Sequence, residues 1–98
     1  MVVITGSVMV KADRLAEAVA LSLEHVRRSR LENGCVSHAV YVDAENPNRL
    51  FFFEEWADQA AVDAHFAVPA SREFVRGLGR CAAERPRLSL YDATRRAV

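Results

Sequence analysis

The hydrophobic pattern of the first third of the chain predicts a strand followed by an amphipathic helix. Residues 2–10, VVITGSVMV, are largely apolar and β-branched, which favours a strand. Apolar residues then recur at helical spacing, and Asp13 is placed to cap the start of that helix. Asn33-Gly34 is a strong stop signal and predicts that the helix ends near Leu31. The core-facing stripe of the helix is expected to hold Leu15, Ala18, Val19, Ser22, Leu23 and Val26.

The middle of the chain predicts a β-hairpin. Residues 35–43, CVSHAVYVD, favour a strand, and residues 49–56, RLFFFEEW, favour another. The segment AENPN at 44–48 predicts the turn between them, because Asn46 and Pro47 both favour turns. Since this connection is short, the two strands are expected to pair in antiparallel fashion.

The last part of the chain predicts two helical pieces and a final strand. Asp58 is expected to cap a helix over residues 59–67, and Pro69 to end it. Residues 70–84 then predict a second helical piece, and residues 87–93, RLSLYDA, predict the last strand. Val62, His65 and Phe66 are expected to share one stripe of the first helix. The core-facing residues of the second helical piece are expected to be Phe74, Val75, Leu78 and Cys81.

The order of the predicted elements is strand, helix, strand, strand, helix in two pieces, strand. This is the split β-α-β pattern of a ferredoxin-like α+β sandwich. At 98 residues the chain is long enough for one domain, and we expect a single domain over residues 1–98.

The segment FFFEEW is apolar on both faces of its predicted strand. Side chains alternate along a strand, so Phe52, Glu54 and Trp56 are expected to share one face. Phe51 and Phe53 then lie on the other face. The one predicted helical layer covers only one face, so we expect a second copy of the chain to cover the other, as a homodimer packed sheet to sheet. The alternative is that the C-terminal tail covers this face.

Composition and charge argue against several classes of protein. The chain has 13 basic and 13 acidic residues, whereas a nucleic-acid-binding protein usually carries a basic excess. No apolar run approaches the ~18 residues of a membrane-spanning helix, and the N-terminus does not resemble a signal peptide. Cys35 and Cys81 lie far apart without a metal or redox spacing, so both are expected to be buried thiols in a reducing, cytoplasmic compartment.

Glu54, Trp56 and His65 are the strongest candidates for chemistry. Glu54 is expected on the same face as Trp56, and His65 follows nine residues after Trp56 in the helix expected to pack over that strand. A carboxylate near an imidazole in an aromatic pocket can accept and return a proton. Alternatively, Glu54 pairs with Arg72, Arg76 or a backbone group, and His65 is an ordinary core residue.

No other chemical motif stands out. The remaining histidines, His25 and His38, show no ligand spacing with His65, so no metal site is expected. The sequence contains no GxGxxG, P-loop or GxSxG motif, so nucleotide binding and serine hydrolysis have no support.

Three segments, in this order, resemble a known family. The run ENGC at 32–35, the NP at 46–47 and EEWADQAAVDAHF at 54–66 are similar to the antibiotic biosynthesis monooxygenase domain family, and more closely to its small quinol-monooxygenase-like members. The resemblance covers nearly the whole chain and implies a dimeric, ferredoxin-like α+β barrel. It also implies that a hydroxylated aromatic or quinol is oxidised by molecular oxygen without a metal, flavin or haem cofactor.

The resemblance further implies roles for particular residues. His65 or Glu54 would deprotonate the substrate, and Trp56 would stack on it or donate a hydrogen bond. Residues expected to line the pocket or bind the substrate are Phe52, Phe66, Phe74, Tyr41 and Tyr91. The family also includes haem-degrading members, which use an asparagine on the first strand that this chain lacks. The other alternative for this chain is a non-catalytic dimeric module that binds a small ligand.

Overall fold

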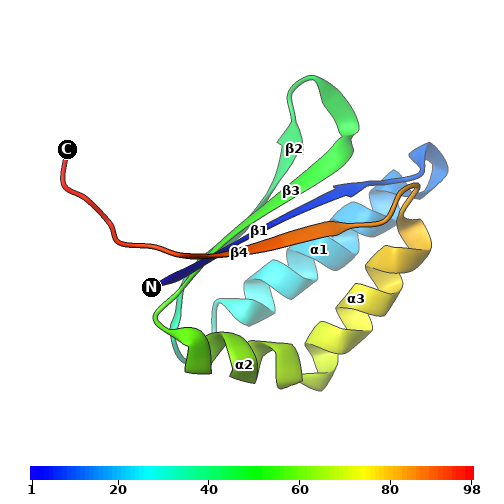
Figure 1. The fold of residues 1–98 in the computed structure, drawn as a ribbon. Helices are drawn as coiled ribbons and strands as arrows, with labels where there is room; N and C mark the ends of the chain where they lie inside the picture. The colour runs from blue at the N-terminus through cyan, green and yellow to red at the C-terminus, as the bar shows by residue number, and fades with distance from the viewer.

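The computed structural model describes residues 1–98 and contains a four-stranded antiparallel sheet with helices on one side (Figure 1). The strands lie in the order β2-β3-β1-β4. This arrangement confirms the predicted ferredoxin-like α+β fold. None of the helices is both long and apolar enough to span a membrane. In chain order the elements are β1 (Val2–Met9), the 3-10 turn η1 (Ala12–Arg14), α1 (Leu15–Ser29), β2 (Cys35–Asp43), β3 (Asn46–Trp56), α2 (Gln59–Ala67), α3 (Pro69–Cys81) and β4 (Arg87–Asp92).

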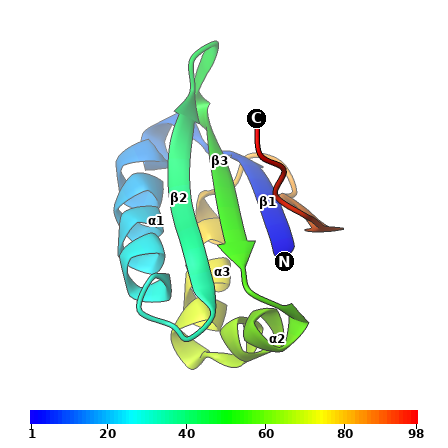
Figure 2. The ribbon, with the colours of Figure 1, turned by 90° about the vertical axis from the view of Figure 1, so that its left-hand side faces the viewer.

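The core lies between the sheet and the layer of helices behind it in Figure 2. The larger cluster of buried side chains consists of Val8, Val10, Ala18, Val26, Leu50, Phe52, Leu78 and Cys81. A smaller cluster beside α2 consists of Val2, Ile4, Trp56 and Val62. Each large buried side chain contributes roughly 1.5–3 kcal/mol to folding. Cys81 is buried as predicted, whereas Cys35 is only half-buried.

The two faces of β3 differ as its alternation predicts. Phe52, Glu54 and Trp56 are buried under the helices, whereas Phe51, on the opposite face, is 38% exposed. The C-terminal residues run away from the sheet in Figure 1. They touch this open face through Arg95, which donates to the Glu55 carboxylate at 3.1 Å.

Several predicted details of the helices are wrong. Asp13 does not cap α1, because the chain enters the helix through η1, and Arg14 stands at the N-cap without a side-chain hydrogen bond. Leu23 and Val75 are 36% and 66% exposed rather than in the core, because the buried sides of α1 and α3 are those that face each other and the sheet. The second helical piece ends at Cys81, before residue 84.

The hairpin turn is also shorter than predicted. Asp43 pairs with Asn46, so β3 begins at Asn46 and includes Pro47, and only two residues form the turn. The register between the strands then shifts between Val42 and Asp43. The ladder to β1 starts later, at Arg49, so Pro47 removes no hydrogen bond from the centre of the sheet.

The turn after α1 depends on Gly34, the predicted stop signal. Its φ is +85°, in the region that favours glycine. A Cβ added there would lie 2.5 Å from the Ala61 side chain. The Gly34 carbonyl also accepts a hydrogen bond from the Ala57 N–H at 2.8 Å. The turn is therefore held against α2, which brings Glu32 beside His65.

Candidate functional site

A cavity of about 540 Å³ lies between α2, α3 and the helix-facing side of the sheet. Three of the residues predicted to line a substrate pocket, Phe52, Phe66 and Phe74, line this cavity. The rings of Phe52 and Phe74 meet edge to face, with centroids 5.8 Å apart. The polar side chains in the lining include Glu54, two histidines and three arginines. An aromatic-walled cavity of this size with a few polar groups is typical of a small-molecule site.

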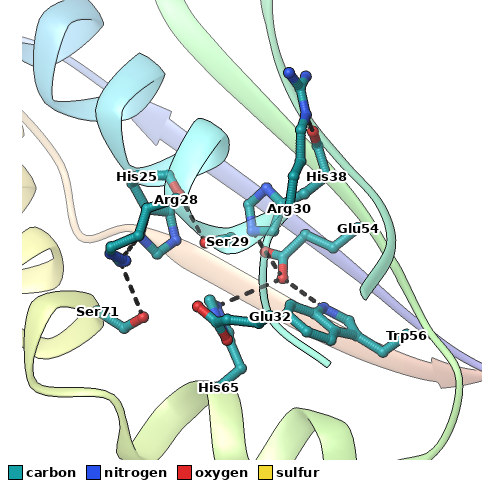
Figure 3. Close-up of polar contacts among 10 residues, drawn as sticks. All are labelled: His25, Arg28, Ser29, Arg30, Glu32, His38, Glu54, Trp56, His65 and Ser71. Carbon is teal, nitrogen blue, oxygen red and sulfur yellow. Dashed lines mark hydrogen bonds and ion pairs between the residues drawn. The ribbon is translucent and has the colours of Figure 1, made fainter. Parts of the chain in front are cut away.

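Glu54 is one of the polar residues that line the cavity. It comes from β3, lines the cavity and is only 6% exposed. Its Oε1 accepts a hydrogen bond from the Trp56 indole Nε1 at 2.9 Å (Figure 3). Trp56 itself is completely buried and does not line the cavity. Trp56 therefore orients the Glu54 carboxylate, and the predicted stacking of Trp56 on a substrate does not fit this cavity.

His65 lies beside Glu54, as the spacing along the sequence suggested. It comes from α2, and its Nδ1 is 2.8 Å from Oε1 of Glu32, which precedes β2. Because an ionised carboxylate only accepts hydrogen bonds, the Nδ1 proton belongs to His65. Its other nitrogen, Nε2, lies 4.0 Å from Oε1 of Glu54. His65 is thus held between two carboxylates and presents Nε2 toward the Glu54 side.

His25 and His38 join this site, contrary to the prediction that the histidines are scattered. One ring nitrogen from each of His25, His38 and His65 lies within 4.8 Å of the other two. Nε2 of His38 is also 3.2 Å from Oε1 of Glu54. Neither ring nitrogen of His38 makes a well-directed hydrogen bond, although the ring is only 1% exposed. The site therefore contains a buried imidazole without a hydrogen-bond partner.

His25 is neutral in this environment. Burial, followed by the neighbouring His38 and His65 and then Arg28, lowers the pKa of His25 to about 3. Its ring stacks on Phe74 with centroids 3.9 Å apart. Nδ1 of His25 accepts a hydrogen bond from Arg28 Nη2 at 2.9 Å, so the single proton of the neutral ring is on Nε2.

The other site predictions have mixed outcomes. Tyr41 and Tyr91 do not line the cavity, because they pair with Phe51 and Val3 on the open face of the sheet. They are 56% and 53% exposed, so the prediction that they donate to a substrate in this pocket is wrong. The alternative in which an arginine pairs with Glu54 is also wrong, because the partner of its carboxylate is the Trp56 indole.

Three residues of this site were not predicted from the sequence: Glu32, His25 and His38. His25 follows Ala18 by seven residues and Ser22 by three. This helical spacing is a signal that could have placed His25 on the buried side of α1. Glu32 belongs to the quoted ENGC segment, but its contact with α2 depends on the turn at Gly34. His38 lies opposite Glu54, and the predicted hairpin with a turn at 44–48 sets residue 43 opposite residue 49 and gives this same pairing, so the strand alternation could have placed His38 on the helix-facing side.

Comparison with known proteins identifies the relatives of this chain. Residues 1–77 match the family described as Antibiotic biosynthesis monooxygenase. A curated protein of Synechocystis sp., described as uncharacterized, is 42% identical over 74 residues, which are 76% of this chain and 50% of that protein. The chain thus spans about half the length of this relative.

Solved structures share the fold over nearly the whole chain. A crystal structure described as an antibiotic biosynthesis monooxygenase is 26% identical, with a TM-score of 0.90, and the match covers 97% of this chain and 100% of that one. A protein from Deinococcus radiodurans is 22% identical, with a TM-score of 0.94, over 100% of this chain and 97% of the other. Because the family match extends over residues 1–77 of 98, the chain belongs to the antibiotic biosynthesis monooxygenase family.

Proposed function

We propose that this protein is a monooxygenase that oxidises a hydroxylated aromatic or quinol with molecular oxygen, without a metal, flavin or haem cofactor. The observation that carries the proposal is the position of His65 between Glu32 and Glu54 in the lining of an aromatic-walled cavity. Membership of the antibiotic biosynthesis monooxygenase family supports the class of reaction.

His65 is the base in this proposal. Glu32 holds the proton on Nδ1, so Nε2 carries the lone pair that accepts a proton from the substrate hydroxyl. The imidazolium that forms lies between the Glu32 and Glu54 carboxylates, which stabilise its positive charge. Trp56 keeps the Glu54 carboxylate in place through its indole N–H. Glu32 and Trp56 are positioning residues, and they do not touch the substrate.

The cavity walls favour the step that follows. Phe52, Phe66 and Phe74 bind the aromatic ring and exclude water from the substrate anion. The electron-rich anion then reacts with oxygen. For a quinol, one oxygen atom forms a bond to a ring carbon and the other leaves as water. The substrate supplies all the electrons, so the reaction balances without an external reductant.

A homodimer is part of this proposal. The open face of the sheet carries Tyr41, Phe51 and Tyr91, which are 56%, 38% and 53% exposed. Exposed aromatic side chains gathered on one face are typical of a surface that a partner covers. A second copy packed sheet to sheet would bury them and leave both cavities, on the helix side, free for substrate.

Oxygen uptake with a panel of hydroquinones and anthrones tests the proposal. His65→Gln is expected to lower the rate by about 100-fold or more, since it removes the base. Asp63→Asn is the matched control, because Asp63 is an exposed residue of the same helix, and this variant should keep the wild-type rate. The proposal fails if no substrate gives uptake above background, or if His65→Gln matches the wild type. Saturable binding without uptake would instead indicate a binding protein.

A further inference from the structure

All three histidines of the chain meet at one place in the fold. His25 comes from α1, His38 from β2 and His65 from α2, and each is at most 6% exposed. Figure 3 shows the rings of His38 and His65 next to the Glu54 carboxylate and the His25 ring to one side, beside Arg28. One nitrogen from each ring lies within 4.8 Å of the others. Three buried imidazoles from three separate elements therefore bring together three nitrogen atoms that can act as metal ligands.

We propose that these three rings bind one divalent transition-metal ion of the zinc type. Neutral imidazole is a favoured ligand for zinc and for other late first-row metals. Three protein ligands around zinc leave a fourth coordination position for an exchangeable group. Oxygen atoms of Glu54 lie next to the cluster and offer a negative charge that balances the ion. This inference goes beyond the oxidation proposed above and does not depend on it.

The unsatisfied ring of His38 is the first support. Buried polar atoms in proteins nearly always have a hydrogen-bond partner. Nδ1 and Nε2 of His38 have none that is well directed, although Nε2 lies 3.2 Å from Oε1 of Glu54. A metal ion at the centre of the cluster gives one of these nitrogens the partner that the protein does not supply.

The contact between Glu32 and His65 is the second support. A histidine that ligates a metal commonly donates its other ring N–H to a carboxylate, which fixes the tautomer and makes the ligating nitrogen more basic. His65 has this arrangement, since Nδ1 donates to Oε1 of Glu32 at 2.8 Å and leaves Nε2 free. The free nitrogen lies on the side of the cluster occupied by Glu54.

Metal binding requires a small contraction of the cluster. Tetrahedral zinc with Zn–N bonds of about 2.0–2.1 Å places its nitrogen ligands roughly 3.4 Å apart. The three nitrogens lie within 4.8 Å of one another, so the rings must approach by roughly an ångström. The His25 and His65 rings each have one side on the cavity, although they also pack against Phe74 and Trp56, and tilting toward the cavity side provides this movement.

Arg28 opposes metal binding in the present arrangement. Its Nη2 donates to Nδ1 of His25 at 2.9 Å, which places the His25 proton on Nε2, the nitrogen that Arg28 does not contact. If Nε2 of His25 is to bind the metal ion, the ring proton must move from Nε2 to Nδ1, and Arg28 must release Nδ1. Nη2 of Arg28 also donates to the Ser71 hydroxyl at 3.2 Å, so the guanidinium still has this hydrogen bond after it releases His25. Removal of the Arg28 charge should therefore strengthen metal binding.

Titration of the chelator-treated full chain with cobalt(II) as probe tests the site, in the absence of any substrate. One ion per chain with the intense visible absorption of four-coordinate cobalt is expected, and zinc should displace it. His38→Gln should abolish the band. Arg28→Gln should bind about tenfold more tightly, since the arginine acts through a ligand. Arg27→Gln is the matched control, because Arg27 is exposed on the same helix, and this variant should match the wild type.

Three results would overturn the inference. One is the absence of the visible band, and another is equal cobalt affinity in wild type and folded His38→Gln. The third is a sulfur-to-cobalt charge-transfer band, which would place the ion on Cys35 or Cys81. If His38→Gln does not fold, the cobalt affinities of Arg28→Gln and Arg27→Gln test the inference instead, because both variants keep all three histidines. Equal affinities in these two variants would contradict it. Because metal binding is measured without substrate, a failure of the metal-site inference can be distinguished from a failure of the proposed oxidation.

Discussion

Mild acid is expected to destabilise the metal-free protein through His25. Burial and the neighbouring His38, His65 and Arg28 lower the pKa of His25 to about 3, against 6.5 for the free side chain. Between these values the folded protein keeps His25 neutral, whereas the unfolded chain binds a proton. Stability is therefore fully present above pH 6.5 and is lost progressively as the pH falls toward 3.

The size of the effect follows from proton linkage. With a pKa of 6.5 in the unfolded chain and about 3 in the fold, the free energy of unfolding falls by about 2 kcal/mol between pH 7 and pH 5. Urea unfolding at both pH values, with chelator present, measures this loss. Fluorescence of Trp56, the only tryptophan and fully buried, reports the transition.

The variant His25→Gln separates this residue from all other titrating groups. Glutamine is polar and neutral at every pH in the range, so about 2 kcal/mol of the pH dependence should disappear. The two proteins share all their other ionisable groups, so the difference between their losses is assigned to His25 and to its interactions with His38 and His65. If the two proteins lose equal stability between pH 7 and pH 5, then the fold does not hold His25 neutral, and the electrostatic account of the cluster is wrong.

Three further substitutions test other parts of the structure. Trp56→Phe removes the buried hydrogen bond to Glu54 and should lower the free energy of unfolding by about 2–4 kcal/mol in urea titrations. Gly34→Ala should lower the free energy of unfolding by about 2–4 kcal/mol, because φ is +85° and the new Cβ would lie 2.5 Å from a side chain of α2. Gly79→Ala is the control, because a Cβ there meets nothing within 4 Å, and thermal melting should show little loss of stability. Phe51→Lys should convert the proposed dimer to monomer in light scattering, and an unchanged mass would contradict sheet-to-sheet packing.

The fold was predictable because its signals are local. The alternation in FFFEEW is contained in one strand, so it correctly separated Phe52, Glu54 and Trp56 from Phe51 without knowledge of any partner strand. Element order likewise follows from periods of two and 3.6 residues and from the stop signal at Gly34.

The buried side of α1 was less predictable, because a helix has several apolar positions around its circumference. Leu23 is more hydrophobic than His25, yet His25 is buried and Leu23 is 36% exposed. The position of α3 against α1 decides which side faces inward, and His25 stacks on Phe74 of α3. Hydrophobicity alone therefore assigned Leu23 to the wrong side of the helix and gave no reason to place His25 on the buried side.

The place of His38 depended on hairpin register. A regular ladder continued from the pair of Asp43 with Asn46 would set His38 opposite Phe51, on the open face. The shift between Val42 and Asp43 instead sets His38 opposite Glu54, on the helix-facing side. A bulge of this kind leaves no unique mark in the sequence. The predicted turn at 44–48, however, sets Asp43 opposite Arg49 and so gives the same pairing of His38 with Glu54, which means that this contact could have been found from the sequence.

The two proposals place different demands on the same atom, Nε2 of His65. Glu32 holds the proton on Nδ1 in either case, so Nε2 has one lone pair to give, either to a substrate proton or to a metal ion. A bound zinc-type ion would therefore remove the base, and the cofactor-free oxidation belongs to the metal-free protein. His38 separates the two roles, because it is a ligand in one and does not line the cavity used by the other. Burial of the His38 ring beside Glu54 without a hydrogen bond lowers the stability of the fold. Proton transfer by His65 does not explain why the ring is there, whereas a metal ion would give it a partner.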